Sequence, residues 1–250
     1  MRYFLQLSYK GTDYHGWQIQ KNALSVQELI NNALTTLLRH PVETLGAGRT
    51  DSGVHATYFI CHFDTNEEIK NEIQFLLSLN GILPNDIAIQ KVFKVNTKSH
   101  ARFTATSRTY HYKICLHKDP FHRGFAWLLY QNLNWDKILE ASNILLEYQD
   151  FTSFSKVDTD VFTNNCKIMK SSWKFDNNIW TYEVKADRFL RNMVRAIVGT
   201  LIQTGREKYT VDKFRKIIES KNRASAGASA PADGLYLVNI EYPTWIHEID

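Results

Sequence analysis

Apolar and polar side chains alternate at the start of the chain, from Arg2 to Tyr9, which is the pattern of a half-buried β-strand. After a turn-rich stretch, Ser25 to Glu28 has the sequence of a capping box, in which a serine and a glutamate three residues later bond the first amides of a helix. The apolar residues that follow recur at helical spacing and predict an amphipathic helix: Val26, Leu29, Ile30, Ala33, Leu34, Leu37 and Leu38.

The rest of the first hundred residues continues this alternation of strands and helices. Aromatic and β-branched residues predict a strand over 57–63. A helix is expected over 67–80, closed by Asn80-Gly81 as its C-terminal cap, and a strand over 87–95. The resulting β-α-β-α-β order is typical of an α+β layer with helices over a sheet.

The second part of the chain has a related order of elements. The predicted elements are a strand over 109–116, a helix over 135–146 capped by Asn134, a hairpin of 167–175 and 180–186 around Asp176-Asn177-Asn178, helices over 189–204 and 211–220, and a closing strand over 235–242. We therefore expect an α+β protein of two related halves, 1–105 and 106–250. Each half should carry a mixed or antiparallel sheet flanked by helices, with a cleft between the halves as the site.

Composition and charge exclude several classes of protein. The longest apolar runs are far shorter than the roughly 20 residues of a membrane span, and the start of the chain has no apolar block with a cleavage site. We therefore expect a cytoplasmic protein without a membrane anchor. Cys61, Cys115 and Cys166 are scattered, which favours buried thiols over disulfides or a zinc site. The net charge of +4 allows a polyanionic partner without requiring one.

The densest polar segment is 46–56, where three glycines surround Arg49, Asp51 and His55. One interpretation is a polar turn in which Asp51 and its neighbours bond the loop's own amides. The other is a catalytic loop, because an arginine keeps a neighbouring carboxylate ionised and a carboxylate can act at the anomeric carbon of a sugar. A base at His55 is the weaker interpretation, since a histidine at the start of a strand is more often structural. No cluster has the spacing of a metal site.

Basic and aromatic side chains interleave along a second segment, where rings can stack on bases and cations can bind phosphates: Arg102, Arg108, Tyr110, His111, Tyr112 and Lys113. The alternative is a strand with its tyrosines in the core. On the helix expected from residue 189, Arg188, Arg191 and Arg195 would form a basic stripe, either solvated or facing phosphates. The small residues of 224–230 predict a surface loop, or a segment that orders on substrate.

The segment Gly48 to Ala56 resembles the motif of the tRNA pseudouridine synthase A family, and the resemblance extends over residues 3–242. The other matching segments follow in family order: 9–18, 25–28, 80–87, 100–103, 108–112, 150–154, 189–195 and 234–237.

This resemblance implies a pseudouridine synthase fold with ferredoxin-like halves and a set of site residues. Asp51 would be the catalytic aspartate, with Arg49 beside it in the loop. Arg195 would pair with Asp51 and keep it ionised, Tyr110 would stack on the target uracil, and Leu235 would close the apolar wall of the pocket.

The same resemblance implies a substrate and a partner. The family acts on uridines 38, 39 and 40 of the tRNA anticodon arm as a homodimer, without metal or cofactor. Thr109 stands where a second cation is common, and Lys113 is a candidate substitute. Two alternatives remain: an RNA-binding module without activity, and a glycoside-processing hydrolase, which requires a second carboxyl near Asp51.

Overall fold

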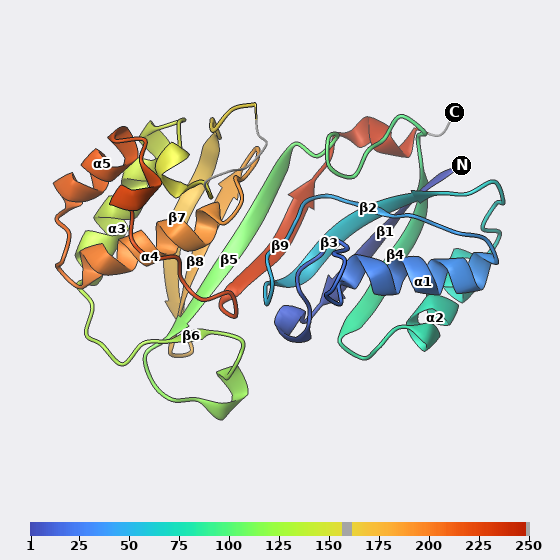
Figure 1. Ribbon diagram of the computed structural model, residues 1–250, viewed down its shortest axis with the longest axis horizontal. Helices are drawn as coiled ribbons and strands as arrows, with labels where there is room; N and C mark the ends of the chain where they lie inside the picture. Colours follow the sequence, from blue (N-terminus) through green and yellow to red (C-terminus); the bar gives the residue numbers. More distant parts are fainter. Residues whose placement is uncertain (157–161, 249–250) are drawn as a thin grey trace. The chain divides into compact units, whose positions relative to one another are not determined.

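The computed structural model describes residues 1–156 and 162–248. The chain forms two compact units (Figure 1). The first comprises Met1–Ser107 and the chain from Tyr236 onward, and the second comprises Arg108–Leu235. The expected halves, 1–105 and 106–250, differ from these units at the end of the chain, because the last strand returns to the first unit.

The first unit is a sheet with the helices α1 and α2 on one face (Figure 1). Its main elements are β1 (Arg2–Tyr9), α1 (Val26–Leu38), β2 (Leu45–Gly46), β3 (His55–Asp64), α2 (Glu72–Ile82), β4 (Ile87–Val95) and β9 (Leu235–Glu241). β1 pairs antiparallel with both β3 and β4, and β2 pairs antiparallel with β3. β9 lies parallel to β3, with Tyr236 opposite His55. The predicted β-α-β-α-β order is confirmed.

The two helices of this unit differ in how well their ends were predicted. α1 begins behind Ser25, whose hydroxyl accepts the Glu28 amide at 3.3 Å, as the capping box predicts. The predicted bounds of α2 are wrong at both ends. It starts at Glu72 because Asn71 is the cap, and it continues through Gly81 to Ile82. Asn80 is therefore no cap.

Asn80 instead joins α2 to the sheet. Its side-chain amide donates to the carbonyl oxygen of Ile89 at 2.9 Å, and its side-chain oxygen accepts the Ile89 amide at 2.7 Å. One side chain thus satisfies both backbone groups of a residue in β4, so these bonds fix the position of the helix along the strand.

The described part of the second unit is built around a hairpin and the helices α3, α4 and α5 (Figure 1). Its main elements are β5 (Ser107–Cys115), β6 (Trp127–Leu128), α3 (Trp135–Ile144), β7 (Ile168–Asp176), β8 (Ile179–Ala186), α4 (Met193–Gly205) and α5 (Val211–Glu219). β8 pairs antiparallel with β5 and β7, and β6 lies parallel to β5. Asn177 and Asn178 both have positive φ, 49° and 63°, which suits the tight turn that joins two twisted strands.

The predicted fold class, α+β with mixed or antiparallel sheets flanked by helices, is confirmed.

α4 is the most buried helix of the second unit, with almost every residue inaccessible to solvent, and it contacts both α3 and α5. Among the described residues, no helix is long and apolar enough to cross a membrane.

Candidate active site

Asp51 lies in the first unit, in the loop that joins β2 to β3. Its neighbours on both sides are bonded to the end of β1 and to the segment that follows it. The Thr50 hydroxyl bonds the buried Tyr9 hydroxyl at 2.9 Å, and the Ser52 hydroxyl donates to the carbonyl oxygen of Tyr14 at 3.3 Å. The Gly53 amide donates to the same carbonyl at 3.2 Å. The backbone around the partly buried Asp51 is therefore fixed from both sides.

A glycine allows this close contact between the two segments. Gly16 has a φ of +87°, and a Cβ atom there would lie 2.2 Å from the carbonyl oxygen of Thr50. Any side chain would push the Asp51 loop away, in addition to the strain of a positive φ. The Trp17 amide donates to that same Thr50 carbonyl at 3.4 Å. Arg49, on the other side of Thr50, is exposed.

His55, the histidine of the motif, has a structural role in the first unit. It is 2% exposed, and its Nδ1 atom accepts the Gly11 amide at 3.0 Å. Its ring stacks on Tyr236 with the ring centres 4.8 Å apart. These contacts join the start of β3 to η1 (Gly11–Asp13) and β9, and they support the structural interpretation over a catalytic base.

Tyr110 and Tyr112 lie two residues apart on β5 of the second unit and differ in exposure. Tyr112 is fully buried, and its hydroxyl donates to the carbonyl oxygen of Pro231 at 2.9 Å. Tyr110 is only partly buried, and its ring meets Phe189 edge-on at 5.0 Å. The core interpretation therefore holds for Tyr112, whereas part of the Tyr110 side chain is accessible.

Arg195 lies in the first turn of α4 and is bonded to the small-residue segment. Its Nε atom donates to the carbonyl oxygen of Ala230 at 2.8 Å, and the Ala230 amide donates back to the Arg195 carbonyl at 2.9 Å. One bond holds the plane of the guanidinium and the other holds the backbone. Leu235, the first residue of β9, is 5% exposed, and its amide donates to the carbonyl oxygen of Ala232 at 2.9 Å.

The small-residue segment packs along α4. The Gly227 amide donates to the Thr200 hydroxyl at 3.0 Å, and the Asn192 side chain donates to Ser229 at 2.6 Å. A Cβ atom on Gly199 would lie 1.9 Å from the carbonyl oxygen of Ala228, so the helix and the segment touch backbone to backbone. The sequence identified 224–230 by composition alone, and no local signal pointed to its contact with Arg195.

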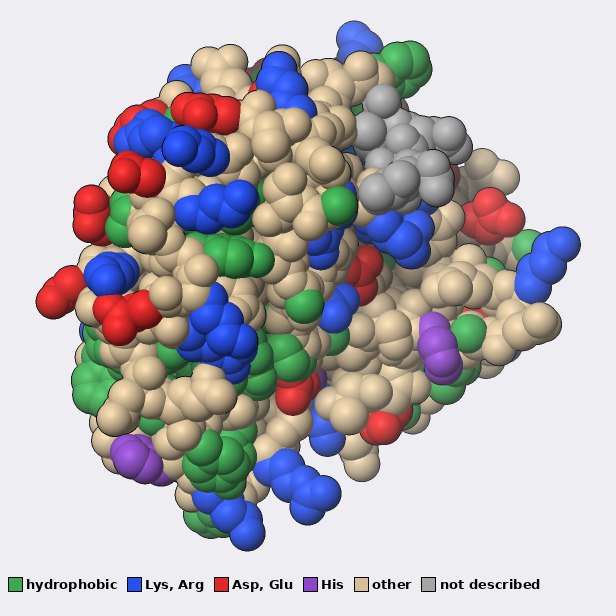
Figure 2. All heavy atoms as spheres, turned by 60° about the vertical axis from the view of Figure 1, so that its left-hand side comes forward, with side chains coloured by type: hydrophobic (Ala, Val, Ile, Leu, Met, Phe, Trp, Pro, Cys, Tyr) green, Lys and Arg blue, Asp and Glu red, His purple; other side chains and the backbone are tan. Residues whose placement is uncertain are grey.

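The predicted basic stripe is wrong, because Arg188 and Arg191 precede the helix. α4 begins only at Met193, behind Asn192 with a φ of 65°. The Asp187 carboxylate accepts the Arg188 amide at 2.7 Å and the Lys167 amide at 2.8 Å, so it holds the preceding chain in a loop. On the face shown in Figure 2, Lys and Arg side chains lie among Asp and Glu.

The cysteines and possible metal ligands show no reactive cluster in the parts of the chain that the structure describes. Cys61, Cys115 and Cys166 are free and buried, as predicted. Burial raises the pKa of the Cys166 thiol to about 12, which disfavours the thiolate. Within the described residues, no three His, Cys, Asp or Glu side chains gather as metal ligands would.

Comparison with known proteins identifies the class of enzyme. The family model described as tRNA pseudouridine synthase matches residues 7–110 and 145–243, which include every predicted site residue. The chain therefore belongs to the tRNA pseudouridine synthase family, the isomerases that convert uridine in tRNA to pseudouridine. The predicted class of function and of enzyme is confirmed.

The similar curated proteins point to one branch of this family. The chain is 52% identical over 248 residues to tRNA pseudouridine synthase A of Bacteroides fragilis, covering 99% of this chain and 98% of that protein. It is 48% identical over 249 residues to the protein of that name from Parabacteroides distasonis, with 100% and 99% covered. For the Clostridium acetobutylicum protein of that name, the values are 39% over 240 residues, with 95% and 98% covered.

Proposed function

We propose that this protein isomerises uridines 38, 39 and 40 in the anticodon stem and loop of tRNA, with Asp51 as the essential carboxylate. The observation that supports it most directly is the fixed loop around Asp51, in a chain that belongs to the tRNA pseudouridine synthase family. A loop backbone that is fixed before substrate arrives lowers the cost of positioning the carboxylate it carries during the reaction.

The reaction breaks the N1–C1′ bond, rotates the uracil and forms the C5–C1′ bond. Asp51 acts at the ribose, either by attack at C1′ or by removing a proton from the sugar. The proton lost from C5 balances the one gained at N1, so the product is an isomer of the substrate. Because there is no net oxidation or reduction, the reaction needs no redox cofactor.

The other predicted residues have distinct roles in this proposal. Arg195 pairs with Asp51 and keeps it ionised, which suits a planar guanidinium whose orientation is held by its bond to Ala230. Tyr110 stacks on the flipped uracil, which matches its partial exposure. Extruding the nucleotide costs a few kcal/mol, which stacking can offset. Arg49 accompanies Asp51 in the loop, and Leu235 forms part of the apolar wall.

The proposed partner is tRNA and the proposed assembly is a homodimer in the cytoplasm, where tRNA is found. Light scattering tests the assembly: a particle of twice the 29.1 kDa chain mass is expected. A particle of one chain mass across micromolar concentrations contradicts the dimer.

The position of modification is tested with tRNA transcripts that keep uridine at only one of positions 38, 39 and 40. The proposal predicts pseudouridine in each of the three transcripts, and none when all three positions carry cytidine. Pseudouridine at other positions would contradict the anticodon-arm assignment while leaving the isomerase activity intact. No pseudouridine in any tRNA would contradict the function itself.

A further inference from the structure

A tight turn in the first unit presents an aromatic ring to solvent. We call residues 99–104 the Phe103 turn; it follows β4 and precedes β5. Phe103 is 75% exposed, although phenylalanine is among the residues most often buried. Single exposed apolar residues are common on protein surfaces, so exposure alone indicates nothing. What distinguishes Phe103 is how firmly the chain beneath it is held.

Four hydrogen bonds fix the backbone within the turn. The Nδ1 atom of His100 accepts the amides of Arg102 at 3.1 Å and Phe103 at 3.3 Å. The Thr104 amide donates to the His100 carbonyl at 3.0 Å, and the His100 amide donates to the Thr104 hydroxyl at 2.9 Å. A turn whose backbone is already fixed loses little conformational freedom on binding.

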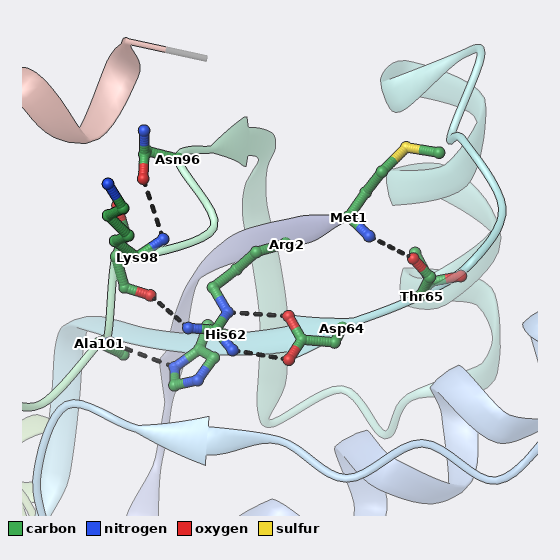
Figure 3. Close-up of polar contacts among 9 residues, drawn as sticks. Met1, Arg2, His62, Asp64, Thr65, Asn96, Lys98 and Ala101 are labelled. Carbon is green, nitrogen blue, oxygen red and sulfur yellow. Dashed lines mark hydrogen bonds and ion pairs between the residues drawn. The ribbon is translucent and has the colours of Figure 1, made fainter. Parts of the chain in front are cut away.

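Further bonds attach the turn to the sheet (Figure 3). The fully buried Ala101 donates its amide to the Nδ1 atom of His62 at 3.1 Å, and its carbonyl accepts the Tyr242 hydroxyl at 2.6 Å. Arg2 donates to the Ser99 carbonyl at 2.8 Å while two of its nitrogens bind the Asp64 carboxylate. The turn is therefore attached to β1, to β3 and to the residue that follows β9.

Three rings contact one another in sequence from the buried interior to the surface. The buried His62 ring meets His100 with centres 4.6 Å apart, and His100 meets Phe103 at 4.4 Å. The Arg102 guanidinium lies over the Phe103 ring, 5.4 Å from its centre. The exposed Phe103 ring thus contacts His100 and an exposed cation.

We infer that Phe103 and Arg102 bind the tRNA away from the reacting uridine, with Phe103 stacked on an unpaired base and Arg102 on a phosphate. This inference rests on the proposed function, because it takes tRNA as the partner. Aromatic stacking on unpaired bases combined with cations on the backbone is how proteins bind single-stranded RNA. Residues 96–104 include the exposed cations Lys98 and Arg102 and no carboxylate, which favours a negatively charged partner such as RNA over a basic or neutral surface.

The position of the turn explains why its effect concerns binding. His55 begins β3 next to the Asp51 loop, and His62 lies seven residues further along the same strand. At about 3.3 Å per residue, the turn is roughly 23 Å from the start of that strand. A base stacked on Phe103 is therefore a different nucleotide from the one that reacts, and the loss of this contact should appear in KM and Kd rather than in kcat.

The test compares Phe103→Ala, Phe103→Leu and Phe103→Trp in binding and turnover assays on full-length tRNA. Stacking of one base contributes about 1–3 kcal/mol, so Ala and Leu should each weaken binding about 5- to 150-fold, whereas Trp should stay within about 3-fold of wild type. Arg102→Gln should lower the slope of log Kd against log salt concentration by the amount that one phosphate contact contributes. Ile73→Ala is the matched control, because Ile73 is 74% exposed in the same unit and belongs to no proposed contact.

Three results would overturn the inference. The first is unchanged tRNA affinity in Phe103→Leu, which keeps an apolar side chain and so protects against a folding artefact. The second is a loss of affinity of the same size in Ile73→Ala. The third is a shift from dimer to monomer in Phe103→Leu with normal binding by the remaining dimer, which would make the turn a protein interface. Absence of activity in the wild-type protein would instead contradict the proposed function.

Discussion

Replacing Gly199 with alanine tests whether the contact between α4 and the small-residue segment holds Arg195 in place. The added methyl would lie 1.9 Å from the carbonyl oxygen of Ala228. An ordinary contact begins at 3.4 Å, so the segment must move by about 1.5 Å. Such a movement breaks the bond from Gly227 to Thr200 and both bonds between Ala230 and Arg195.

The expected cost follows from these three bonds. At about 1 kcal/mol each, their loss costs about 3 kcal/mol, and the higher helix propensity of alanine returns up to about 1 kcal/mol. The net destabilisation is about 2 kcal/mol, which at a slope of about 2 kcal/mol per molar lowers the urea midpoint by about 1 M. Tryptophan fluorescence is a suitable readout, because four of the six tryptophans lie in the second unit.

Gly81→Ala is the matched control for this substitution. Gly81 also lies within a helix, and a Cβ atom there meets nothing within 4 Å. It should stabilise the first unit by up to about 1 kcal/mol. Isomerisation by Gly199→Ala should fall together with its stability, since the guanidinium of Arg195 loses its support. A Gly199→Ala protein as stable and as active as wild type would show that the contact between α4 and the segment does not hold Arg195 in place.

Three further predictions concern single side chains. Burial, with the charges of Arg2 and a neighbouring histidine, lowers the pKa of His62 to about 4. Because the unfolded chain therefore binds a proton at His62 more readily than the folded protein, the free energy of unfolding is highest above about pH 6.5. It falls by up to about 3 kcal/mol as the pH falls toward 4. His62→Asn should flatten that pH dependence of unfolding, and an unchanged profile would exclude His62 as its source. Asn80→Ala should lower the free energy of unfolding by about 1–2 kcal/mol through the lost bonds to Ile89, and Asn80→Asp should lower it by less. No change in either variant would show that the two bonds to Ile89 contribute nothing to stability. Arg195→Lys should lower the single-turnover rate at least ten-fold with tRNA affinity within a few-fold, because an ammonium cannot replace a planar fork; a near-normal rate would dismiss the ion pair.

The sequence predicted the elements of this fold whose signals are local. The helix behind Ser25 and the strands Arg2–Tyr9 and Ile87–Val95 have the expected bounds, because periodicity and a capping residue lie within a few positions of each other. The start of α4 was missed because apolar spacing continues back through Phe189, whereas the left-handed Asn192 interrupts the helix. Helical spacing does not reveal a backbone conformation that a contact elsewhere in the fold selects.

The candidate site likewise has features that the local sequence predicts and features that depend on contacts between distant residues. The Asp51 loop is visible in the sequence as a cluster of glycines and polar residues, but its bonds to Tyr9 and Tyr14 are set by how two strands pair. The support of Arg195 comes from Ala230, 35 residues away, and no local pattern encodes it. Arg188 and Arg191 show the converse error, since spacing alone suggested a stripe that the loop before α4 does not form.

The central claim is that Asp51 carries the chemistry, and an Asp51→Asn variant tests it most directly. The measurement is the single-turnover rate of pseudouridine formation on tRNA that lacks the modification, together with tRNA affinity and unfolding. Asp119→Asn, in a surface loop of the second unit, is the control for the same change of carboxylate to amide. If Asp51 carries the chemistry, Asp51→Asn forms no pseudouridine, while its tRNA affinity stays within a few-fold of wild type and its unfolding midpoint is unchanged. Pseudouridine formation at a rate near that of wild type, or a loss of folding in place of a loss of chemistry, would contradict this claim.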